Sequence, residues 1–128
     1  MSHFTTIETQ IRDIQALQDA CKEIGLELAV NTVARGYGRS TRQGDYVIRL
    51  KGPYDIALNK QPDGTYGLTT DWWQGHVEKE VGRNYGRLLQ LSGVHKTIRE
   101  SLQRGYRVKR SAAQDGSIRV TVGLPAGR

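Results

Sequence analysis

Short alternating segments separated by turn signals occupy the middle of the chain and most constrain its fold. Residues 46–50 and 54–58 place apolar side chains at every second position, as half-buried strands do. Gly52-Pro53 separates these two segments, and Pro62-Asp63-Gly64 is a strong turn signal before residues 65–70. The pattern predicts three antiparallel strands joined by short turns, that is, a meander.

The segment before this meander predicts a strand, a helix and a second strand. Phe4 to Gln10 is rich in Thr and Ile and fits a first strand. Asp13 offers a helix N-cap, and Gly25 stands where a left-handed C-cap is wanted. Leu26 to Val30 then alternates as a second strand. The apolar stripe of the helix recurs at spacings of three and four and consists of Ile14, Leu17, Cys21 and Ile24.

Residues 78–104 are helical by composition, but their apolar face rotates near Ser92-Gly93. A bent helix and two helices meeting at that point both remain open. Residues 106–111 and 117–122 flank Gln114-Asp115-Gly116 and predict a second hairpin, followed by a frayed tail over 123–128.

The order is therefore β-α-β-β-β-β-α-β-β in a single domain over residues 1–128. An α+β fold suits this order best: one mainly antiparallel sheet of about five to seven strands with two main helices packed on one face. The outer face of such a sheet is a natural place for a partner.

The composition of the 128 residues is that of a soluble protein with a modest core. A single cysteine excludes a disulfide framework, and no apolar stretch has the length needed to cross a bilayer. No signal peptide is evident at the start, so we expect a cytoplasmic protein. Nineteen Lys and Arg against thirteen Asp and Glu give +6, which suits either a solvated basic surface or contact with a polyanion.

Asp71-Trp72-Trp73 is the motif that most favours a binding role. Adjacent tryptophans after a strand cannot face the same side of an extended chain. One is expected in the core, and the other either covers the sheet edge or is an exposed anchor for a partner. Asp71 is expected to cap the following turn or to bond an indole N–H, and His76 to lie at the rim.

Basic residues form the other candidate surface. The segment from Asn31 to Gly44 predicts an exposed, flexible loop in which Tyr37 could stack on a base. If the basic groups converge, they would make a surface that follows phosphates. The candidates are Arg35, Arg39 and Arg42 in the loop, Arg83 and Arg87 on one helix face, and Arg107, Lys109 and Arg110 on the C-terminal hairpin.

The residues that could carry chemistry do not form a recognised pattern. Three histidines, His3, His76 and His95, are widely spaced, and there is neither an HExxH motif nor a pair of cysteines. Cys21 lies on the apolar stripe of its helix, where a buried and unreactive thiol is expected. We therefore expect no catalytic residues, no metal and no cofactor.

Several short motifs together give the chain a resemblance to a known family. They are Met1-Ser-His-Phe-Thr-Thr-Ile7, Arg35-Gly36-Tyr37, Tyr54-Asp55-Ile56, Asp71-Trp72-Trp73, Gly105-Tyr106 and Asp115-Gly116-Ser117-Ile118. With these motifs the chain resembles the plastid hypothetical reading frame thirty-five family, whose members occur in cyanobacteria, in some algal plastid genomes and in other bacteria, and whose function is unknown.

The resemblance implies a small soluble accessory protein, often in photosynthetic lineages, that would lie in the stroma if plastid-encoded. Similar bacterial genes lie near one for an AAA-type ATPase, which suggests an ATPase-linked partner. Our hypothesis is a non-enzymatic accessory protein that binds a protein partner, such as an AAA-type ATPase or a photosynthesis-related assembly. The alternative is an RNA- or ribosome-binding module that uses the arginine clusters.

Overall fold

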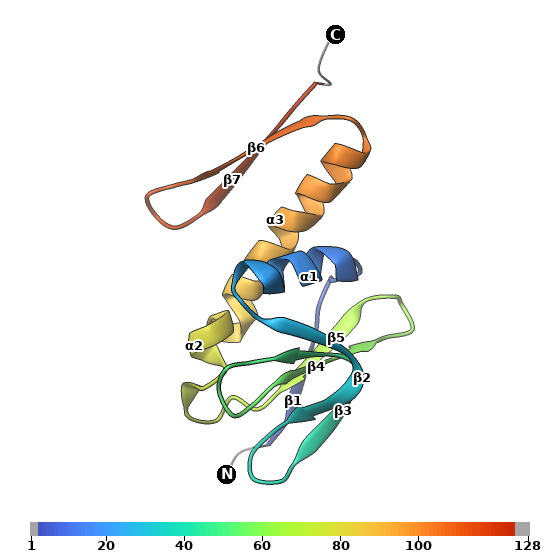
Figure 1. Ribbon diagram of the computed structural model, residues 1–128, viewed down its shortest axis with the longest axis vertical. Helices are drawn as coiled ribbons and strands as arrows, with labels where there is room; N and C mark the ends of the chain where they lie inside the picture. Colours follow the sequence, from blue (N-terminus) through green and yellow to red (C-terminus); the bar gives the residue numbers. More distant parts are fainter. Residues whose placement is uncertain (1–2, 125–128) are drawn as a thin grey trace.

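The computed structural model describes residues 3–124 and confirms the α+β fold (Figure 1). A five-stranded antiparallel sheet has the order β1-β5-β4-β3-β2, and a separate hairpin pairs β6 with β7. The first half contains β1 (Thr5–Glu8), α1 (Ile14–Glu23), β2 (Glu27–Arg35), β3 (Thr41–Arg49), β4 (Ile56–Lys60) and β5 (Tyr66–Thr70). The second half contains the 3-10 turns η1 (Trp73–Gly75) and η2 (Arg83–Tyr85), α2 (Glu78–Val81), α3 (Gly86–Gln103), β6 (Arg107–Ala112) and β7 (Ile118–Gly123).

The first helix forms as the sequence predicts. The Asp13 carboxylate accepts a hydrogen bond from the backbone N–H of Ala16 at 3.0 Å, and Gly25 takes a left-handed φ of 76° after the last turn. Leu17 and Cys21 are completely buried on the face that meets the sheet. Burial raises the pKa of the Cys21 thiol to about 12, so it remains protonated and unreactive at neutral pH.

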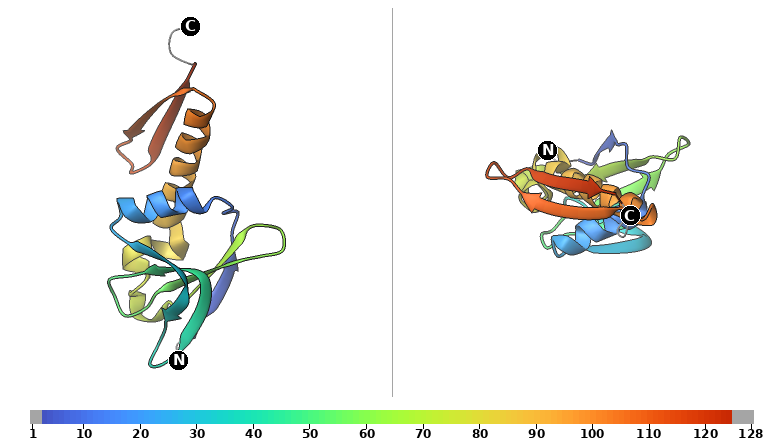
Figure 2. Two further views of the ribbon diagram at one scale, coloured as in Figure 1. Left: turned by 45° about the vertical axis from the view of Figure 1, so that its right-hand side comes forward. Right: turned by 90° about the horizontal axis from the view of Figure 1, so that it is seen from above.

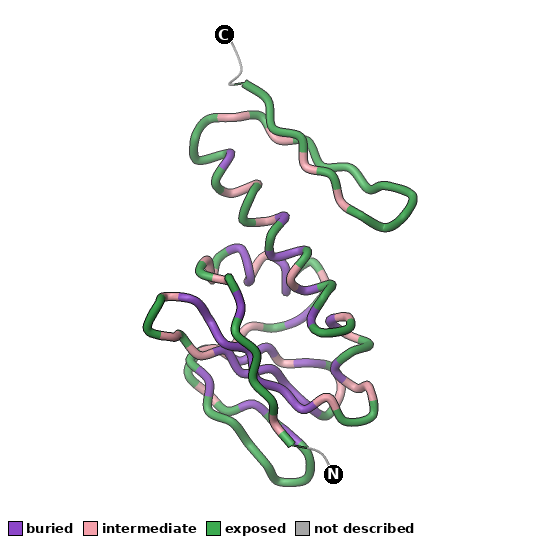
Figure 3. Tube along the Cα trace, turned by 180° about the vertical axis from the view of Figure 1, so that it is seen from behind, coloured by how far each residue is buried: buried purple, intermediate pink, exposed green. Residues whose placement is uncertain are grey.

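The main core lies between one face of the sheet and the helices. Ile48, Ile56, Leu58 and Leu68 share that face because they occupy paired positions on β3, β4 and β5. Leu88 of α3 packs into the same cluster. Figure 3 shows the buried segments gathered where the helices approach the strands. Both main helices therefore cover one face, as expected.

The prediction of a loop over residues 31–44 is wrong. β2 continues to Arg35 and β3 begins at Thr41, so only residues 36–40 form the turn. The long β2–β3 hairpin curls, and the backbone N–H of Asp55 donates to the Arg35 carbonyl at 2.9 Å. Such pairing between distant segments stabilises strand structure that Gly-rich and Arg-rich local sequence does not favour.

The curled hairpin also covers part of the second face of the sheet. A small second core there consists of Ala34, Val47 and Ala57, all completely buried. The five residues of β5 are all buried. The sequence suggested an open outer face, but in the centre of the sheet both faces are covered.

The helix expected over residues 78–104 is broken, but not at Ser92-Gly93. The break lies at residues 82–85, and α3 runs without interruption from Gly86 to Gln103. Gly82 has a φ of 86°, and a Cβ there would lie 2.7 Å from the backbone nitrogen of Arg87, so only glycine fits. Tyr85 also takes a left-handed conformation, because its completely buried ring packs in the core.

The C-terminal hairpin forms as predicted and lies along the far end of α3, away from the sheet (Figures 1 and 2). Most of its residues are exposed, and Ile118 packs against the core cluster. Gly123 pairs with Arg107 and ends β7 instead of starting a frayed tail. Residues 125–128 of that expected tail, and Met1 and Ser2 of the N-terminal motif, lie outside the described residues. No described helix has the length and apolarity needed to cross a membrane.

Candidate functional site: an aromatic surface beside a buried ion cluster

Aromatic side chains from three separate turns meet at one end of the sheet. We define the aromatic surface by Tyr37 in the β2–β3 turn, Tyr54 before β4, Trp73 in η1 and His76 after it; Tyr54 is buried in the core, and Tyr37 and Trp73 are the exposed members. Tyr37 and Trp73 meet edge to face with ring centroids 6.2 Å apart. Tyr54 and His76 meet in the same way at 5.4 Å. The surface therefore joins residues 22 to 36 positions apart in the sequence.

The two tryptophans lie in different environments, as their adjacent positions after a strand predict. Trp72 packs against the core cluster, with its ring edge to face with Tyr85 at 4.7 Å. Trp73 leaves 38% of its surface exposed. Gln74 follows with a left-handed φ of 56°, and Asp71 accepts a hydrogen bond from the Trp73 backbone N–H at 2.9 Å. This turn separates the two indoles, and the capping role expected for Asp71 is confirmed.

Asp71 and His76 lie in the same turn but have different neighbours. The Asp71 carboxylate is buried and bonded to backbone, whereas the half-buried His76 ring faces Tyr54. Across residues 3–124 no three His, Cys, Asp or Glu side chains are grouped closely enough to hold a metal ion. The geometry of this turn thus provides shape and apolar contact area.

Arg35 ends β2, two residues before Tyr37, and its guanidinium is already bound within the chain. Its Nε and Nη2 donate to the two carboxylate oxygens of Asp55, each at 2.8 Å, and Nη2 also donates to the carbonyls of Leu50 and Gly52. Arg49 adds a contact of 3.2 Å to the same carboxylate. Arg35 was expected as a loop residue of a basic surface, but here it ties β2 to the turn before β4.

Asp55 was not among the site residues that sequence reasoning selected. Its side chain is completely buried, and it also accepts hydrogen bonds from the backbone N–H groups of Arg35 and Leu50. Burial alone would raise the pKa of Asp55, but the hydrogen bonds from Arg35 and Leu50 hold it below its usual value. An aspartate between Tyr54 and Ile56 in an alternating strand was the signal that could have identified it.

The other basic candidates lie in separate places and form no common surface. Arg39 and Arg42 lie on the β2–β3 hairpin at one end of the long axis, and the C-terminal hairpin lies at the other end (Figure 1). Arg83 and Arg87 were expected on one helix face, which is wrong because the left-handed residues Asn84 and Tyr85 separate η2 from α3. They line different hollows of the surface.

The C-terminal hairpin divides its basic residues between its two faces. Arg107 and Lys109 share one face, and the register places Arg119 on that face as well. Arg119 was not among the basic residues selected from the sequence. The Asp115-Gly116 turn sets the register of the hairpin, and that register would have placed Arg119 on the same face as Arg107 and Lys109. Arg110 lies on the opposite face, where its guanidinium binds both carboxylate oxygens of Glu23 at 2.8 and 2.7 Å.

Glu23 also contacts His95, whose Nε2 lies 2.7 Å from its Oε1. His95 is half-buried, at the surface between α1 and α3. The hydrogen bond from Arg110, supported by His95, lowers the pKa of Glu23 to about 2. This carboxylate joins α1, α3 and β6.

The fold and the site together define a small α+β protein with a curled antiparallel sheet and a partly exposed aromatic surface. A family model described as "Protein of unknown function (DUF1257)" matches residues 20–121. The chain therefore belongs to this family. It is also 28% identical over 126 residues to the "Uncharacterized protein ycf35" of Pyropia yezoensis, which covers 95% of this chain and 96% of that protein. No solved structure gives a significant match.

Proposed function

We propose that this protein is a non-enzymatic accessory protein that holds a partner protein against its aromatic surface. The observation that carries the proposal is the exposed Trp73 ring, set beside Tyr37, which is 53% exposed. Tryptophan and tyrosine offer large apolar areas with few rotatable bonds, which is why they dominate binding energies at protein interfaces. Trp72 is the tryptophan that packs against the core cluster, so the exposed part of Trp73 is available for a partner.

The β2–β3 hairpin, which carries Tyr37, supports a partner with acidic character. Arg39 and Arg42 are exposed on the same β2–β3 hairpin that carries Tyr37. Basic groups at the rim of an aromatic patch steer an acidic partner and add specificity. We propose an AAA-type ATPase as the first partner to test, because the family resemblance implies an ATPase-linked partner, and a photosynthesis-related assembly as the second. The site of action would be the cytoplasm, or the stroma for a plastid-encoded protein.

The experiment compares Trp73→Ala with a matched control. Tagged wild-type protein, Trp73→Ala and Leu102→Ala, which shortens an exposed apolar side chain on α3 (57% exposed), are used to capture partners from the native lysate after nuclease treatment. Trp73→Ala should lose the captured protein, while Leu102→Ala keeps it. Urea unfolding must show Trp73→Ala to be folded. Capture that survives Trp73→Ala would contradict the proposal.

A second candidate is RNA binding through the hairpin. The favouring observation is that Arg107, Lys109 and Arg119 share one exposed face. Phosphate contacts release counterions, so binding would weaken steeply as the salt concentration rises. Lys109→Ala should reduce that salt dependence, and an absence of RNA binding at low salt would eliminate this candidate.

A further inference from the structure

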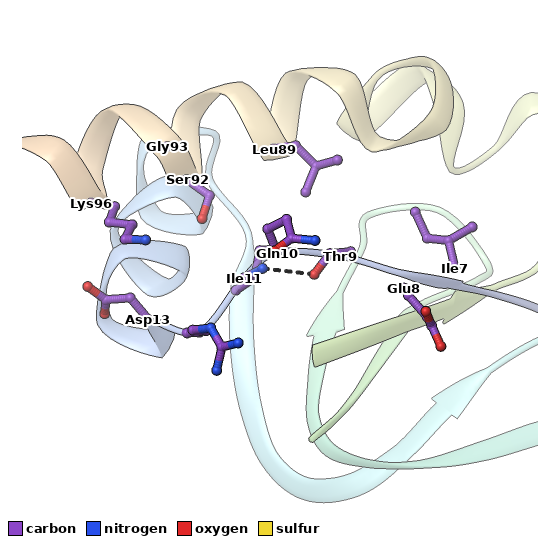
Figure 4. Close-up of a pocket in the computed structure, with 11 residues that line it drawn as sticks. Ile7, Glu8, Thr9, Gln10, Ile11, Asp13, Leu89, Ser92, Gly93 and Lys96 are labelled. Carbon is purple, nitrogen blue, oxygen red and sulfur yellow. Dashed lines mark hydrogen bonds between the residues drawn. The ribbon is translucent and has the colours of Figure 1, made fainter. Parts of the chain in front are cut away.

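An open groove lies between β1 and α3, and it shares no residue with the aromatic surface (Figure 4). Its volume is about 390 Å³, and its lining is mostly apolar. One wall is the segment from Ile7 to Asp13. The other is a stripe on α3 formed by Leu89, Ser92, Gly93 and Lys96. These positions follow helical spacing, so one face of α3 looks directly onto the groove (Figure 4).

The β1 strand beside this groove has a free edge. It is the last strand in the sheet order, it pairs with β5 on one side, and all four of its residues are exposed. Alternate N–H and C=O groups of an edge strand point away from the sheet and are available to another strand. A peptide in extended conformation can pair with such an edge, whereas a helix or a compact ligand cannot.

The register of β1 determines which side chains of an added strand would face the groove. Ile7 lies opposite Leu68 of β5, so it belongs to the face of the sheet that meets the helices, yet it is 38% exposed. A strand paired with β1 would point every second side chain to the same face. Those side chains would enter the space between Ile7 and Leu89.

Gly93 keeps this space open. A Cβ at Gly93 would meet no atom within 4 Å, so no packing contact within the described chain requires a glycine there. Glycine inside a helix is destabilising relative to alanine. Its lack of a side chain instead leaves room at the centre of the α3 stripe, between Leu89 and Lys96 (Figure 4).

We propose that the groove binds an extended, largely apolar peptide segment of another polypeptide, which pairs with β1 and inserts alternate side chains beneath Gly93. The charges along the groove balance, because Glu8 and Asp13 oppose Arg12 and Lys96. That balance favours an apolar segment over a strongly charged one. A second copy paired through β1 would supply only Ile7 as a large apolar side chain on this face, so it would leave much of the groove empty.

The test uses random short peptides displayed on phage, selected on the purified wild-type protein. Recovered peptides are synthesised, and their affinities are measured by calorimetry for wild type, Gly93→Leu and Gly86→Leu. Gly86, the first residue of α3, also has nothing within 4 Å of an added Cβ but lies outside the groove, so it is the matched control. Gly93→Leu should weaken binding by at least about tenfold, because its side chain takes the place of one buried apolar residue of the peptide.

Two further measurements complete the test. Bound peptide should slow amide hydrogen exchange in β1, and the recovered sequences should alternate apolar residues. Failure to recover any binder, equal affinity for Gly93→Leu, or protection elsewhere in the chain would overturn the proposal. Sedimentation that shows a dimer of the free protein, lost in Gly93→Leu, would also overturn it by identifying a second copy as the occupant. Trp73→Ala should leave these affinities unchanged, which separates this proposal from the aromatic surface.

Discussion

Two carboxylates in this molecule, those of Asp55 and Glu23, each bind two basic side chains, but only the Asp55 carboxylate is completely buried. Asp55 is completely buried in the sheet and binds Arg35, Arg49 and two backbone N–H groups. Glu23 is about one-third exposed and binds Arg110 and His95 through side chains alone. The same chemistry therefore serves two purposes: Asp55 closes the curled sheet, and Glu23 attaches the C-terminal hairpin.

The difference between these two carboxylates shows how burial determines the free energy lost when an ion pair is broken. If Asp55 is removed, its two backbone N–H donors lose their acceptor, and Arg35 and Arg49 keep only their hydrogen bonds to other oxygen atoms. If Glu23 is removed, Arg110 and His95 return to water. The β6–β7 hairpin has little buried area of its own, and an isolated two-stranded hairpin is marginally stable in water. We therefore expect the hairpin to open locally while the rest of the protein stays folded.

The largest expected effect is that of Asp55→Ala. It should lower the free energy of unfolding by about 3–5 kcal/mol, because it leaves two backbone N–H groups and two partly exposed guanidinium groups without their carboxylate. Urea unfolding measures this loss. Glu27→Ala, at an exposed carboxylate on β2, is the control and should change stability by less than about 0.5 kcal/mol. If Asp55→Ala lowers the free energy of unfolding by less than about 1 kcal/mol, Asp55 contributes no more than an exposed ion pair such as that of Glu23.

The two arginines at Asp55 should differ. Arg35 donates to both carboxylate oxygens and to two carbonyls, whereas Arg49 donates to one carboxylate oxygen at 3.2 Å, to the Val33 carbonyl at 2.9 Å and to the Thr32 hydroxyl at 3.2 Å. Arg35→Ala should cost about 2 kcal/mol and Arg49→Ala about 1 kcal/mol in unfolding free energy. If urea unfolding shows a larger loss of stability for Arg49→Ala than for Arg35→Ala, then Arg49 is the main arginine that holds the curled sheet to Asp55.

Glu23→Gln should change the global unfolding free energy by less than about 1 kcal/mol, as expected for a solvent-accessible ion pair. Its main effect should be local: amide hydrogen exchange in β6 and β7 should accelerate, while exchange in β4 stays unchanged. Glu100→Gln is the control, since within residues 3–124 the Glu100 carboxylate pairs only with Lys96 of the same helix, at 3.9 Å. Equal acceleration in the two variants would show that Glu23 does not attach the hairpin.

The smallest expected effect is a pH-dependent release of the hairpin. The pKa of Glu23 is lowered in the folded state from 4.5 to about 2, chiefly by the hydrogen bond from Arg110. The attachment is therefore fully present above about pH 4.5 and is lost as the pH falls toward about 2. Amide signals of β6, followed by NMR during acid titration, should shift in that window. The same titration of Glu23→Gln should show no such transition.

Local sequence was sufficient for α1 and for the strands of the meander. Asp13 and Gly25 act within one turn of the helix ends, so the predicted caps are confirmed. The Pro62-Asp63-Gly64 turn joins β4 and β5 as expected. The aromatic surface was predictable only in part, because Trp73 could be selected from its residue type but its contact with Tyr37 depends on how β2 and β3 curl.

The sequence by itself determined the elements whose hydrogen bonds close over a few residues: the capped first helix, the meander and the C-terminal hairpin. Only the tertiary structure decided that residues 31–35 extend β2, that the second helix breaks at residues 82–85, and which tryptophan faces solvent. These outcomes depend on groups far apart in the chain, such as Asp55 with Arg35 and Trp72 with Tyr85. No local pattern encodes the burial that makes such contacts favourable, since that burial arises only when the distant segments meet.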